Sequence, residues 1–397
     1  MERFFGLDVH KNYVVAAAVD RQSTQVFADR FNLSDGLARF TKRLQPTDTV
    51  VVEASTNVWP IHDLLSAKAG KVLVANPIKT RAIAEARIKT DKVDALTLAK
   101  LASAGFVAEV WVPDPDTRDL RALASHRQSL SGMATRLKNK IHALLKRVGI
   151  TNYPDDLFTR NGRLFLAKVE LRPAARAELD SSLRLLDATL AELEHTEAQF
   201  AQRSAQNNAV YLLMQIPGIK YLSALTILSE IGDINRFPSA KTLASYAGLV
   251  PRISQSGQKL YTGHITKAGR KKLRWILVEC AHTAARRDAS LREFFTRIQR
   301  KKGRNVAVVA LARKLLVIIW HMLVKGEPYK KAEPALVARK LELLAWKLGK
   351  EGRQGLNCAD FVAKGLQSLD PQGQLPAEIL SRYRQKAQRQ KGLVLTA

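Results

Sequence analysis

Lys89-Thr90-Asp91-Lys92-Val93-Asp94 stands directly before the apolar run Ala95-Leu96-Thr97-Leu98-Ala99. The two aspartates are three residues apart, and residues at this spacing share one face of a helix. Two converging carboxylates repel each other unless a proton or a cation lies between them. The pair does not establish a metal site alone, so its meaning depends on the ligands that the rest of the chain supplies.

The sequence before this pair predicts one α/β unit over residues 1 to about 105. Apolar, β-branched runs bounded by turn residues predict strands, and Leu and Phe at helical spacing predict the helices between them. The predicted order is β-β-β-α-β-α-β-α, which is the order of an RNase H-like fold. The strands are expected at 3–9, 13–19, 24–31, 49–53 and 71–75, and the first two helices at 34–44 and 60–69.

Two of the predicted strands end in a carboxylate, the first in Asp8 and the fourth in Glu53. Strands one and four are neighbours in an RNase H-like sheet, so these side chains should lie close to Asp91 and Asp94. Four hard oxygen donors with neither histidine nor cysteine suit Mg²⁺, with Mn²⁺ as a second choice, rather than zinc. Any one of these acids alone is more often a helix cap or a surface charge. His10 would lie beside Asp8, in a structural, phosphate-contacting or chemical role.

The net charge of +28 indicates a polyanionic partner, and nucleic acid is the commonest one. Residues 251–330 contain 19 Lys and Arg against 4 acids, so 19 − 4 = +15 lies in a fifth of the chain. Such a concentration predicts a surface that follows phosphates and binding that weakens steeply with salt. A basic protein without a nucleic-acid role is the plainer alternative.

The chain has two cysteines, Cys280 and Cys358, so we expect neither a disulfide framework nor a cysteine-based zinc site. Its longest apolar stretch, residues 315–324, contains His321 and is too short to span a bilayer. The first residues lack the pattern of a signal peptide. A cytoplasmic protein with no membrane partner is therefore expected.

The middle of the chain predicts two long helices after an extended linker at 110–115. Residues 116–148 have an apolar face among basic residues, and residues 149–163 are rich in turn formers. From Pro173 a heptad pattern begins, with one polar break at Glu197. This pattern predicts either a coiled-coil dimer arm or a helix of a protein core. Its members are Leu179, Leu183, Leu186, Leu190, Leu193 and Phe200.

A different module begins near Tyr211. Ile216-Pro217-Gly218-Ile219-Lys220 precedes a predicted helix, as in a helix-hairpin-helix motif whose glycine lets backbone N–H groups approach a phosphate. A turn between two helices with no ligand is the equal alternative. Further helices are predicted at 239–247, 271–287 and 306–323, around a polar loop or hairpin at 251–267. Residues 331–397 predict one helix, 335–347, and end near a basic segment, 382–391. A packed accessory helix pair and a nucleic-acid-binding extension are both open as interpretations of this segment.

Several motifs together resemble the DEDD transposases of bacterial insertion sequences, insertion sequence family 110. The resemblance covers residues 1–330 in order, with Thr266-Lys267 where the family commonly has Ser-Lys. The motifs are Gly6-Leu7-Asp8-Val9-His10-Lys11, Val52-Glu53-Ala54-Ser55, Lys89-Thr90-Asp91-Lys92-Val93-Asp94-Ala95, Ile216-Pro217-Gly218-Ile219, Ala247-Gly248-Leu249-Val250-Pro251-Arg252, Ser256-Gly257, Gly263-His264-Ile265-Thr266-Lys267-Ala268-Gly269 and Leu273-Arg274.

The resemblance implies an RNase H-like, RuvC-like domain at 1–115 and a helical coiled-coil arm at 116–206. It implies a mainly helical transposase domain at 207–330, and nothing carries over to the extension at 331–397. The implied activity is transposition, the cutting and rejoining of target and donor DNA under the guidance of a structured noncoding bridge RNA. The implied assembly is a homodimer that pairs into a tetramer, in the bacterial cytoplasm and associated with the nucleoid.

The resemblance also implies that Ser256 is the catalytic serine, which forms a covalent phosphoserine intermediate with DNA beside Mg²⁺ held by Asp8, Glu53, Asp91 and Asp94. The residues themselves argue less strongly, because a serine hydroxyl is a poor nucleophile until a base or a metal activates it. Gly257 gives the loop backbone freedom, and no His-Asp partner stands nearby in the sequence. Ser254 is the nearest rival.

Cations surround this serine in the sequence, and phosphate contact that positions a strand is their expected role. A solvated helix face is the alternative for any one of them. Tyr261 is a candidate for stacking on bases, whereas Tyr246 suits a core. The predicted nucleic-acid-binding residues are Arg252, Lys259, Lys267, Arg270, Lys271, Lys272, Arg274, Arg300, Lys301, Lys302 and Arg304.

Two other functions are compatible with these patterns. A metal-only RuvC-like nuclease or Holliday-junction resolvase would use the four acids to direct water and would not need Ser256. A non-catalytic, basic nucleic-acid-binding protein would need neither, although the presence of all four acids argues against a decayed nuclease domain.

Overall fold

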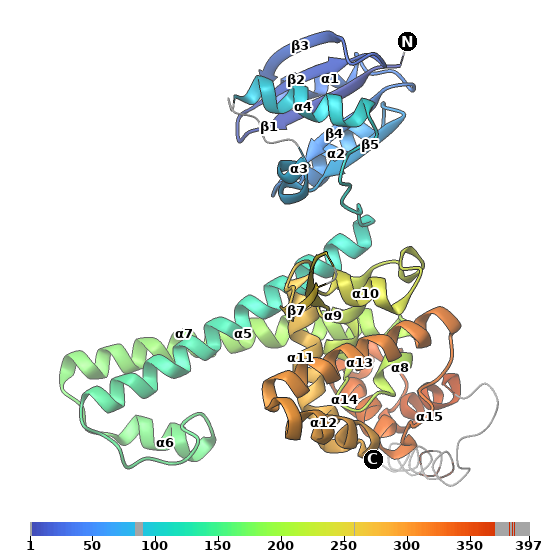
Figure 1. Cartoon of the computed structure of the whole chain (residues 1–397). Helices are drawn as coiled ribbons and strands as arrows, with labels where there is room; N and C mark the ends of the chain where they lie inside the picture. The colour runs from blue at the N-terminus through green and yellow to red at the C-terminus, as the bar shows by residue number, and fades with distance from the viewer. Residues whose placement is uncertain are drawn as a thin grey trace. The chain divides into compact units, whose positions relative to one another are not determined.

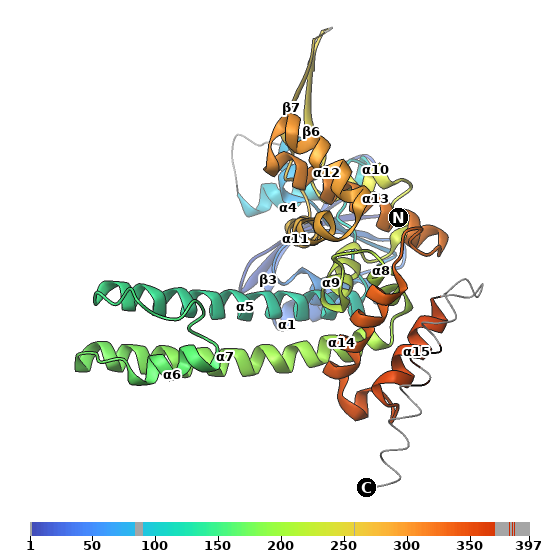
Figure 2. The same ribbon diagram turned by 90° about the horizontal axis from the view of Figure 1, so that it is seen from below.

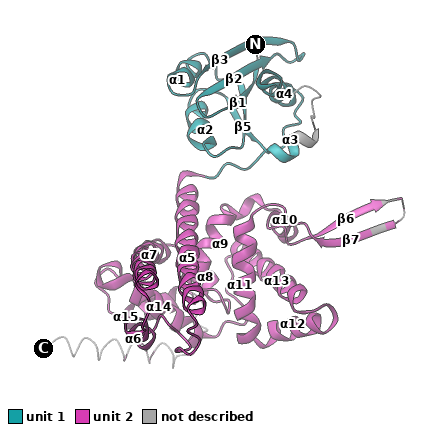
Figure 3. Cartoon of the chain, turned by 90° about the vertical axis from the view of Figure 1, so that its left-hand side faces the viewer, with its two compact units in different colours: residues 1–113 teal, residues 114–397 magenta. Residues whose placement is uncertain are grey.

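A computed structural model describes residues 2–83, 90–257 and 259–369 together with 381, 383 and 385, without the side chains of 81–83, 256 and 260. Lys89 and all but two residues of the basic segment 382–391 lie outside the described residues. The chain forms two compact units, residues 1–113 and 114–397 (Figure 3).

The first unit is a mixed five-stranded sheet with the strand order β3-β2-β1-β4-β5. β1 is antiparallel to β2 and parallel to β4, and the predicted order of strands and helices is confirmed apart from one additional helix, α3, before α4. Its elements are β1 Phe4–Val9, β2 Tyr13–Val19, β3 Gln25–Asn32, α1 Asp35–Thr41, β4 Thr49–Glu53, α2 Val58–Ser66, β5 Lys71–Ala75, α3 Pro77–Ile83 and α4 Asp91–Ser103.

The two faces of this sheet are covered by different helices (Figure 1). Leu7 and Val52 pack on one face with apolar residues of α1 and α2. Val51 packs on the opposite face with Leu98 of α4. Because successive side chains of a strand point to opposite faces, each central strand contributes to both layers. A near-continuous apolar run such as 49–52 is the sequence signature of such a strand.

The second unit begins with an arm of two long helices, α5 Pro115–Arg147 and α7 Pro173–Ala205, which lie side by side (Figure 2). α6 Arg160–Lys168 lies in the connection between them and was not predicted as a helix. Leu179 and Leu186 of the heptad pattern are buried against residues of α5 and α6, such as Ile141 and Leu166. This part of the seam is therefore filled within the chain, as the core-helix alternative predicts, and the coiled-coil dimer stays a prediction.

Glu197, the polar break in the heptad pattern, has a partner on the facing helix. Its Oε1 accepts hydrogen bonds from Arg127 Nε at 2.9 Å and from Nη2 at 2.5 Å. The two side chains are about three-quarters or more buried, where a carboxylate without a partner would be costly. The break in the pattern thus marks an ion pair between α5 and α7.

The rest of the second unit is helical apart from one hairpin, β6–β7. Its core includes Ala124 of α5, Phe200 of α7 and Leu341 of α14, so the base of the arm and the extension after residue 330 share one core. Its elements are α8 Asn208–Met214, α9 Tyr221–Ile231, the 3₁₀ helix η1 Ile234–Arg236, α10 Ala240–Tyr246, β6 Pro251–Ser256, β7 Lys259–Ile265, α11 Lys271–Arg287, α12 Ala289–Lys302, α13 Arg304–Lys325, α14 Pro334–Gly352 and α15 Cys358–Ser368.

α13 is the described helix that is long and apolar enough to cross a membrane by length and composition. Leu311, Leu315 and Ile319 on this helix are fully buried in the core of the second unit. α13 therefore has the character of a core helix.

The turn between α8 and α9 packs tightly on α11. Gly218 has φ +90°, and a Cβ at this position would lie 2.6 Å from the carbonyl oxygen of Cys280. Ile216 and Ile219 on either side are fully buried. The glycine is thus required for close approach of two backbones, which favours the packing interpretation of this turn over a phosphate-binding one.

Lys340 fixes α14 to this same turn. Its side chain is 5% exposed, and its Nζ donates hydrogen bonds to the carbonyl oxygens of Met214 at 2.6 Å and Ile216 at 2.7 Å. Burial lowers the pKa of Lys340 to about 8. A buried ammonium is tolerated here because two carbonyl groups replace part of its hydration.

The low pKa of Lys340 predicts a pH-dependent stability. Above pH 8 the folded chain releases this proton, whereas the unfolded chain keeps it up to about pH 10.5. The unfolded state therefore binds more protons in this window, and the cost of the buried charge disappears as the pH rises. The free energy of unfolding of the wild type, relative to Lys340→Met, should rise by up to about 1.4 kcal/mol per pH unit between pH 8 and 10. Urea unfolding at several pH values measures this difference, and a constant difference would contradict the assignment.

Candidate active site

The carboxyl ends of β1 and β4 lie next to each other in the first unit. Leu7 pairs with Val52 in the parallel ladder, and Asp8 and Glu53 are the residues that follow them. Leu7 and Val52 face α1 and α2, so the alternation of a strand places Asp8 and Glu53 toward the face covered by α4.

The amino-terminal end of α4 lies at this same edge, with Asp91 and Asp94 in its first turn. Thr90 caps the helix, and its Oγ1 accepts a hydrogen bond from the backbone N–H of Val93 at 3.3 Å. α4 can approach β1 closely because Gly6 has no side chain: a Cβ there would lie 2.0 Å from the carbonyl oxygen of Ala95. The small residue in the motif around Asp8 thus brings the helix carboxylates to the strand carboxylate.

Asp8, His10 and Asp91 form a cluster in which one ligand atom from each residue lies within 4.8 Å of the others. The Nε2 of His10 is 3.1 Å from Asp8 Oδ2 and 3.3 Å from Asp91 Oδ2. The structure therefore brings together two of the four predicted acids and adds an imidazole. Glu53 lies beside Asp8, at the end of the neighbouring strand β4. Asp94 lies three residues after Asp91 in the first turn of α4.

The electrostatics of the cluster suit a cation. Burial raises the pKa of Asp8; the charge and hydrogen bond of His10 oppose this shift, and the negative charges of Asp91 and Asp94 add to it. A divalent cation between these carboxylates would offset their mutual electrostatic repulsion. The carboxylate oxygens are ligands that Mg²⁺ and Mn²⁺ prefer, whereas the imidazole of His10, absent from the predicted donor set, is a ligand more typical of zinc and other transition metals.

Tyr13 and Arg30 also belong to this edge, and sequence reasoning did not include them. The hydroxyl of Tyr13 donates a hydrogen bond to Asp91 Oδ2 at 3.0 Å, and its ring stacks on His10 with a centroid distance of 4.5 Å. The Arg30 guanidinium lies 4.0 Å from the centre of the Tyr13 ring. The sequence signal for including Tyr13 was the short turn between β1 and β2, which places Tyr13 beside His10.

In the second unit, Ser256 lies at the end of β6, paired in the ladder with Lys259 of β7. The hairpin projects as a two-stranded ribbon from the helical body (Figure 2, Figure 3). Gly257 at its tip has φ +58° and no atoms within 4 Å of where a Cβ would stand. Arg252, Ser254, Lys259 and Tyr261 are all exposed, so this ribbon offers polar and aromatic side chains to a partner.

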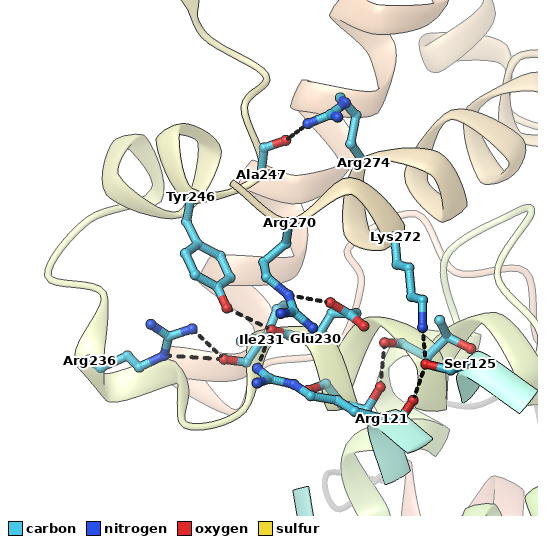
Figure 4. Close-up of polar contacts among 12 residues, drawn as sticks. Arg121, Ser125, Glu230, Ile231, Arg236, Tyr246, Ala247, Arg270, Lys272 and Arg274 are labelled. Atoms are coloured by element: carbon cyan, nitrogen blue, oxygen red, sulfur yellow. Dashed lines mark hydrogen bonds and ion pairs between the residues drawn. The ribbon is translucent and has the colours of Figure 1, made fainter. Parts of the chain in front are cut away.

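The predicted nucleic-acid-binding cations fall into two groups. Arg270, Lys272 and Arg274 have intramolecular partners: Glu230, the hydroxyl of Ser125 and the carbonyl of Ala247 (Figure 4). Their positions favour a structural role. The others are exposed and stay candidates for phosphate contact: Arg252, Lys259, Lys267, Lys271, Arg300, Lys301, Lys302 and Arg304.

Glu230 lies at the centre of this structural group and is fully buried. Its Oε2 accepts a hydrogen bond from Arg270 Nε at 2.6 Å, while its Oε1 has no hydrogen-bond partner among the described residues. Burial opposes the charge of Arg270, but the hydrogen bond and charge of Glu230 outweigh burial and raise the pKa of Arg270. The sequence signal for this site was a single acid near the end of the otherwise apolar helix α9.

The end of α9 also holds both ends of the ribbon. Tyr246, which precedes β6, donates its hydroxyl to the carbonyl of Glu230 at 3.3 Å, and Arg270 follows β7 (Figure 4). Arg121 donates to the carbonyls of Ser229 and Glu230, and Arg236 donates to that of Ile231. These arginines supply donors and positive charge to the carboxyl end of the helix. Glu230 is therefore placed to orient the ribbon that carries Ser256.

Two family models match the chain. Residues 5–150 match the model of the DEDD transposases of IS110 elements, and residues 210–296 match the model described as the transposase IS116/IS110/IS902 family. The first match contains the carboxylate cluster. The second contains the α8–α9 turn, Glu230 and the ribbon with Ser256.

Relatives include the putative transposase y4rJ of Sinorhizobium fredii, 30% identical over 72% of this chain and 79% of that protein. The putative transposase y4qE of the same organism is 26% identical over 89% of this chain and 90% of its own length. The pilin gene-inverting protein of Moraxella bovis is 28% identical over 83% of this chain and 98% of its own length. The chain belongs to the IS116/IS110/IS902 family of transposases.

Proposed function

We propose that this transposase cuts and rejoins DNA through a covalent intermediate on Ser256, with a divalent cation held by Asp8, Glu53, Asp91 and Asp94. The first unit then serves as an RNase H-like, RuvC-like metal domain. The observation that carries the proposal is the convergence of Asp8, His10 and Asp91 to within 4.8 Å in a chain whose residues 5–150 and 210–296 match models of IS110-type transposases.

Each group has a defined role in this proposal. The Ser256 hydroxyl oxygen forms a bond to the phosphorus of a DNA phosphate, the bond to the 3′ oxygen breaks, and the hydroxyl proton passes to the departing oxygen. A phosphoserine linked to the 5′ end of one strand and a free 3′ hydroxyl result. A second hydroxyl reverses the step on another strand and rejoins the DNA. A bound Mg²⁺ or Mn²⁺ would neutralise charge on the phosphate.

The remaining residues position the reactants. Tyr13 donates a hydrogen bond to the Asp91 carboxylate, and the imidazole of His10 lies 3.3 Å from the same oxygen, so both side chains hold Asp91 in place. The exposed cations of β6, β7 and α12 hold phosphates without reading sequence. DNA sequence is read by base pairing with a noncoding bridge RNA, and the protein acts as dimers that pair into a tetramer. The bacterial cytoplasm, beside the nucleoid, is the proposed location.

Asp8→Asn tests the metal role of the first unit. Removal of one charged ligand from the cluster should lower DNA strand cleavage in Mg²⁺ by about a thousandfold, equivalent to several kcal/mol of lost charge stabilisation. The binding of Mn²⁺, followed by electron paramagnetic resonance, should weaken in parallel. Asp35→Asn, which changes an exposed acid of α1, is the matched control and should leave both unchanged. Cleavage by Asp8→Asn at the wild-type rate would contradict the proposal.

A further inference from the structure

A groove with a volume of about 980 Å³ lies where the base of the ribbon meets α12 and α13. Ile265 and Pro251 line it from the ribbon, and Phe294, Val306 and Val309 line it from the helices. Val306 is 46% exposed, so this side of α13 is open to a ligand. The groove is therefore an accessible apolar surface rather than a gap in the core.

The polar residues that line the groove are all cationic or neutral. Lys267, Lys302, Arg313 and Lys314 contribute to it, with no Asp or Glu among the lining residues. Lys314 lies over the ring of Phe294, its Nζ 4.3 Å from the centroid. An apolar floor with a cationic rim suits a ligand that combines flat apolar faces with negative charges.

Lys267 has an unusual backbone at this place. Its φ is +54°, in the left-handed region that non-glycine residues rarely adopt. Its backbone N–H donates to the carbonyl of Gly248, which holds the turn in this conformation. Strain of this kind is concentrated at ligand-binding positions. The turn directs the chain from the ribbon to α11 and keeps Lys267 at the rim of the groove.

We infer that this groove binds unpaired nucleotides of the DNA strand on which Ser256 acts, with bases on the apolar floor and phosphates at the cationic rim. The inference rests on the proposed function of Ser256. A paired duplex hides its base faces, so the apolar floor favours a single strand, for which stacking platforms beside cations are the general mode of recognition. The groove is continuous with the ribbon, and the ribbon carries the serine that attacks DNA. The expected strand is therefore DNA rather than RNA.

The length of the ribbon sets the distance to the reacting phosphate. Position 256 is five residues from Pro251 at the groove, which corresponds to about 17 Å of strand. At a rise of about 3.4 Å per nucleotide, a DNA strand laid along the ribbon reaches the groove within about five nucleotides. The nucleotides in the groove therefore belong to the immediate flank of the cleavage site.

A photocrosslinking experiment tests the groove separately from the chemistry. The full chain with Ser256→Ala carries p-benzoylphenylalanine at position 306, and the probe is single-stranded oligo(dT). Crosslinks to the DNA are expected at position 306. The same probe at Val324, which is 43% exposed and about 27 Å along α13, should give none. Crosslinks at 306 only to oligo(U), only to duplex DNA, or to a second copy of the chain would overturn the inference.

Charge variants give a second readout. Lys302→Gln combined with Arg313→Gln should lower the slope of log K against log salt for oligo(dT) by about 1.4, the value for two lost phosphate contacts on a single strand. Lys325→Gln, an exposed charge on the same helix, should leave the slope unchanged. Val306→Glu places a carboxylate in the groove at an exposed position and should weaken oligo(dT) binding at least tenfold. An unchanged slope and affinity in these variants would overturn the inference.

The same crosslinking experiment with Ser256 intact distinguishes an error in the groove assignment from an error in the proposed function. When Ser256 is joined to a DNA strand, position 306 should crosslink within about five nucleotides of the attached phosphate. An adduct at Ser256 without crosslinks at 306 would refute the groove and leave the function intact. Crosslinks to oligo(dT) without any adduct would refute the nucleophile and leave a strand-binding groove.

Discussion

Ser256→Ala is expected to abolish the covalent attachment of DNA to the protein and to lower strand cleavage by at least about 10⁴-fold. Deletion of the attacking oxygen removes the nucleophile itself, and such losses are among the largest that single substitutions produce. Position 256 lies at the tip of an exposed ribbon, so removal of one hydroxyl should not disturb the fold. The measurement is a denaturing gel in which end-labelled DNA migrates with the protein.

Ser254→Ala is the matched control, because this serine lies two residues away on the same strand and is exposed. It should retain both the adduct and the cleavage. A metal-only nuclease that directs water would instead cleave normally with Ser256→Ala and leave free 5′ phosphates. Unimpaired cleavage by this variant would therefore support the resolvase alternative.

Glu230→Ala is expected to cost about 2–4 kcal/mol of the free energy of unfolding of the second unit. The substitution leaves Arg270 without its charge partner, and breaking a buried pair by removing one member is strongly destabilising. Breaking a fully buried pair costs about 3–5 kcal/mol. The expected cost is somewhat lower here because water screens the Arg270 side chain, which is 37% exposed. The ends of β6 and β7 should lose their orientation as well, so formation of the Ser256 adduct should slow in the fraction that stays folded.

Urea unfolding followed by tryptophan fluorescence measures this cost. Trp59→Phe with Trp111→Phe confines the signal to Trp275, Trp320 and Trp346 of the second unit. Glu279→Ala, an exposed acid on α11, is the control and should stay within about 0.5 kcal/mol of its parent. Arg270→Ala should cost less in the Glu230→Ala background than in the wild type, because the pair is already broken. Equal costs in both backgrounds would show that the ion pair does not couple these residues.

Local patterns predicted the first unit well. The apolar runs that end in Asp8 and Glu53 became adjacent parallel strands, and the acids Asp91 and Asp94 at helical spacing lie in the first turn of α4. These features are set by short-range chemistry, by strand alternation and helical periodicity, which a single sequence displays. The convergence of Asp8 and Asp91 followed from the order of the elements.

Contacts between distant residues could not be predicted in the same way. Tyr13 meets Asp91 across 78 positions, and Arg270 meets Glu230 across 40. The charge density after residue 251 suggested that Arg270, Lys272 and Arg274 face phosphates, yet the fold supplies each with a partner. Burial decides whether a cation is structural or free, and burial depends on packing that spacing does not reveal.

Two amphipathic helices of the second unit, α12 and α15, were not predicted although the sequence carries a signal for them. On α12, Leu291, Phe294, Phe295 and Ile298 recur at helical spacing within a strongly basic surface, and α15 follows a glycine-containing turn at the end of α14. Packing against α13 and α14 stabilises these two helices. The extension after residue 330 packs into the core through Lys340 and Leu341, as the accessory-helix interpretation of the predicted helix 335–347 expects.

Mass spectrometry of the covalent complex tests the central claim most directly. The protein is incubated with DNA in Mg²⁺, denatured and digested with nuclease and trypsin, which cleaves after Arg252 and Lys259 and releases residues 253–259 with both serines. Fragmentation should place a nucleotide phosphate on Ser256 in the wild type, and Asp8→Asn should yield the modified peptide about a thousandfold more slowly. A phosphate on Ser254, or an unmodified peptide from a preparation that cleaves DNA, would contradict the account.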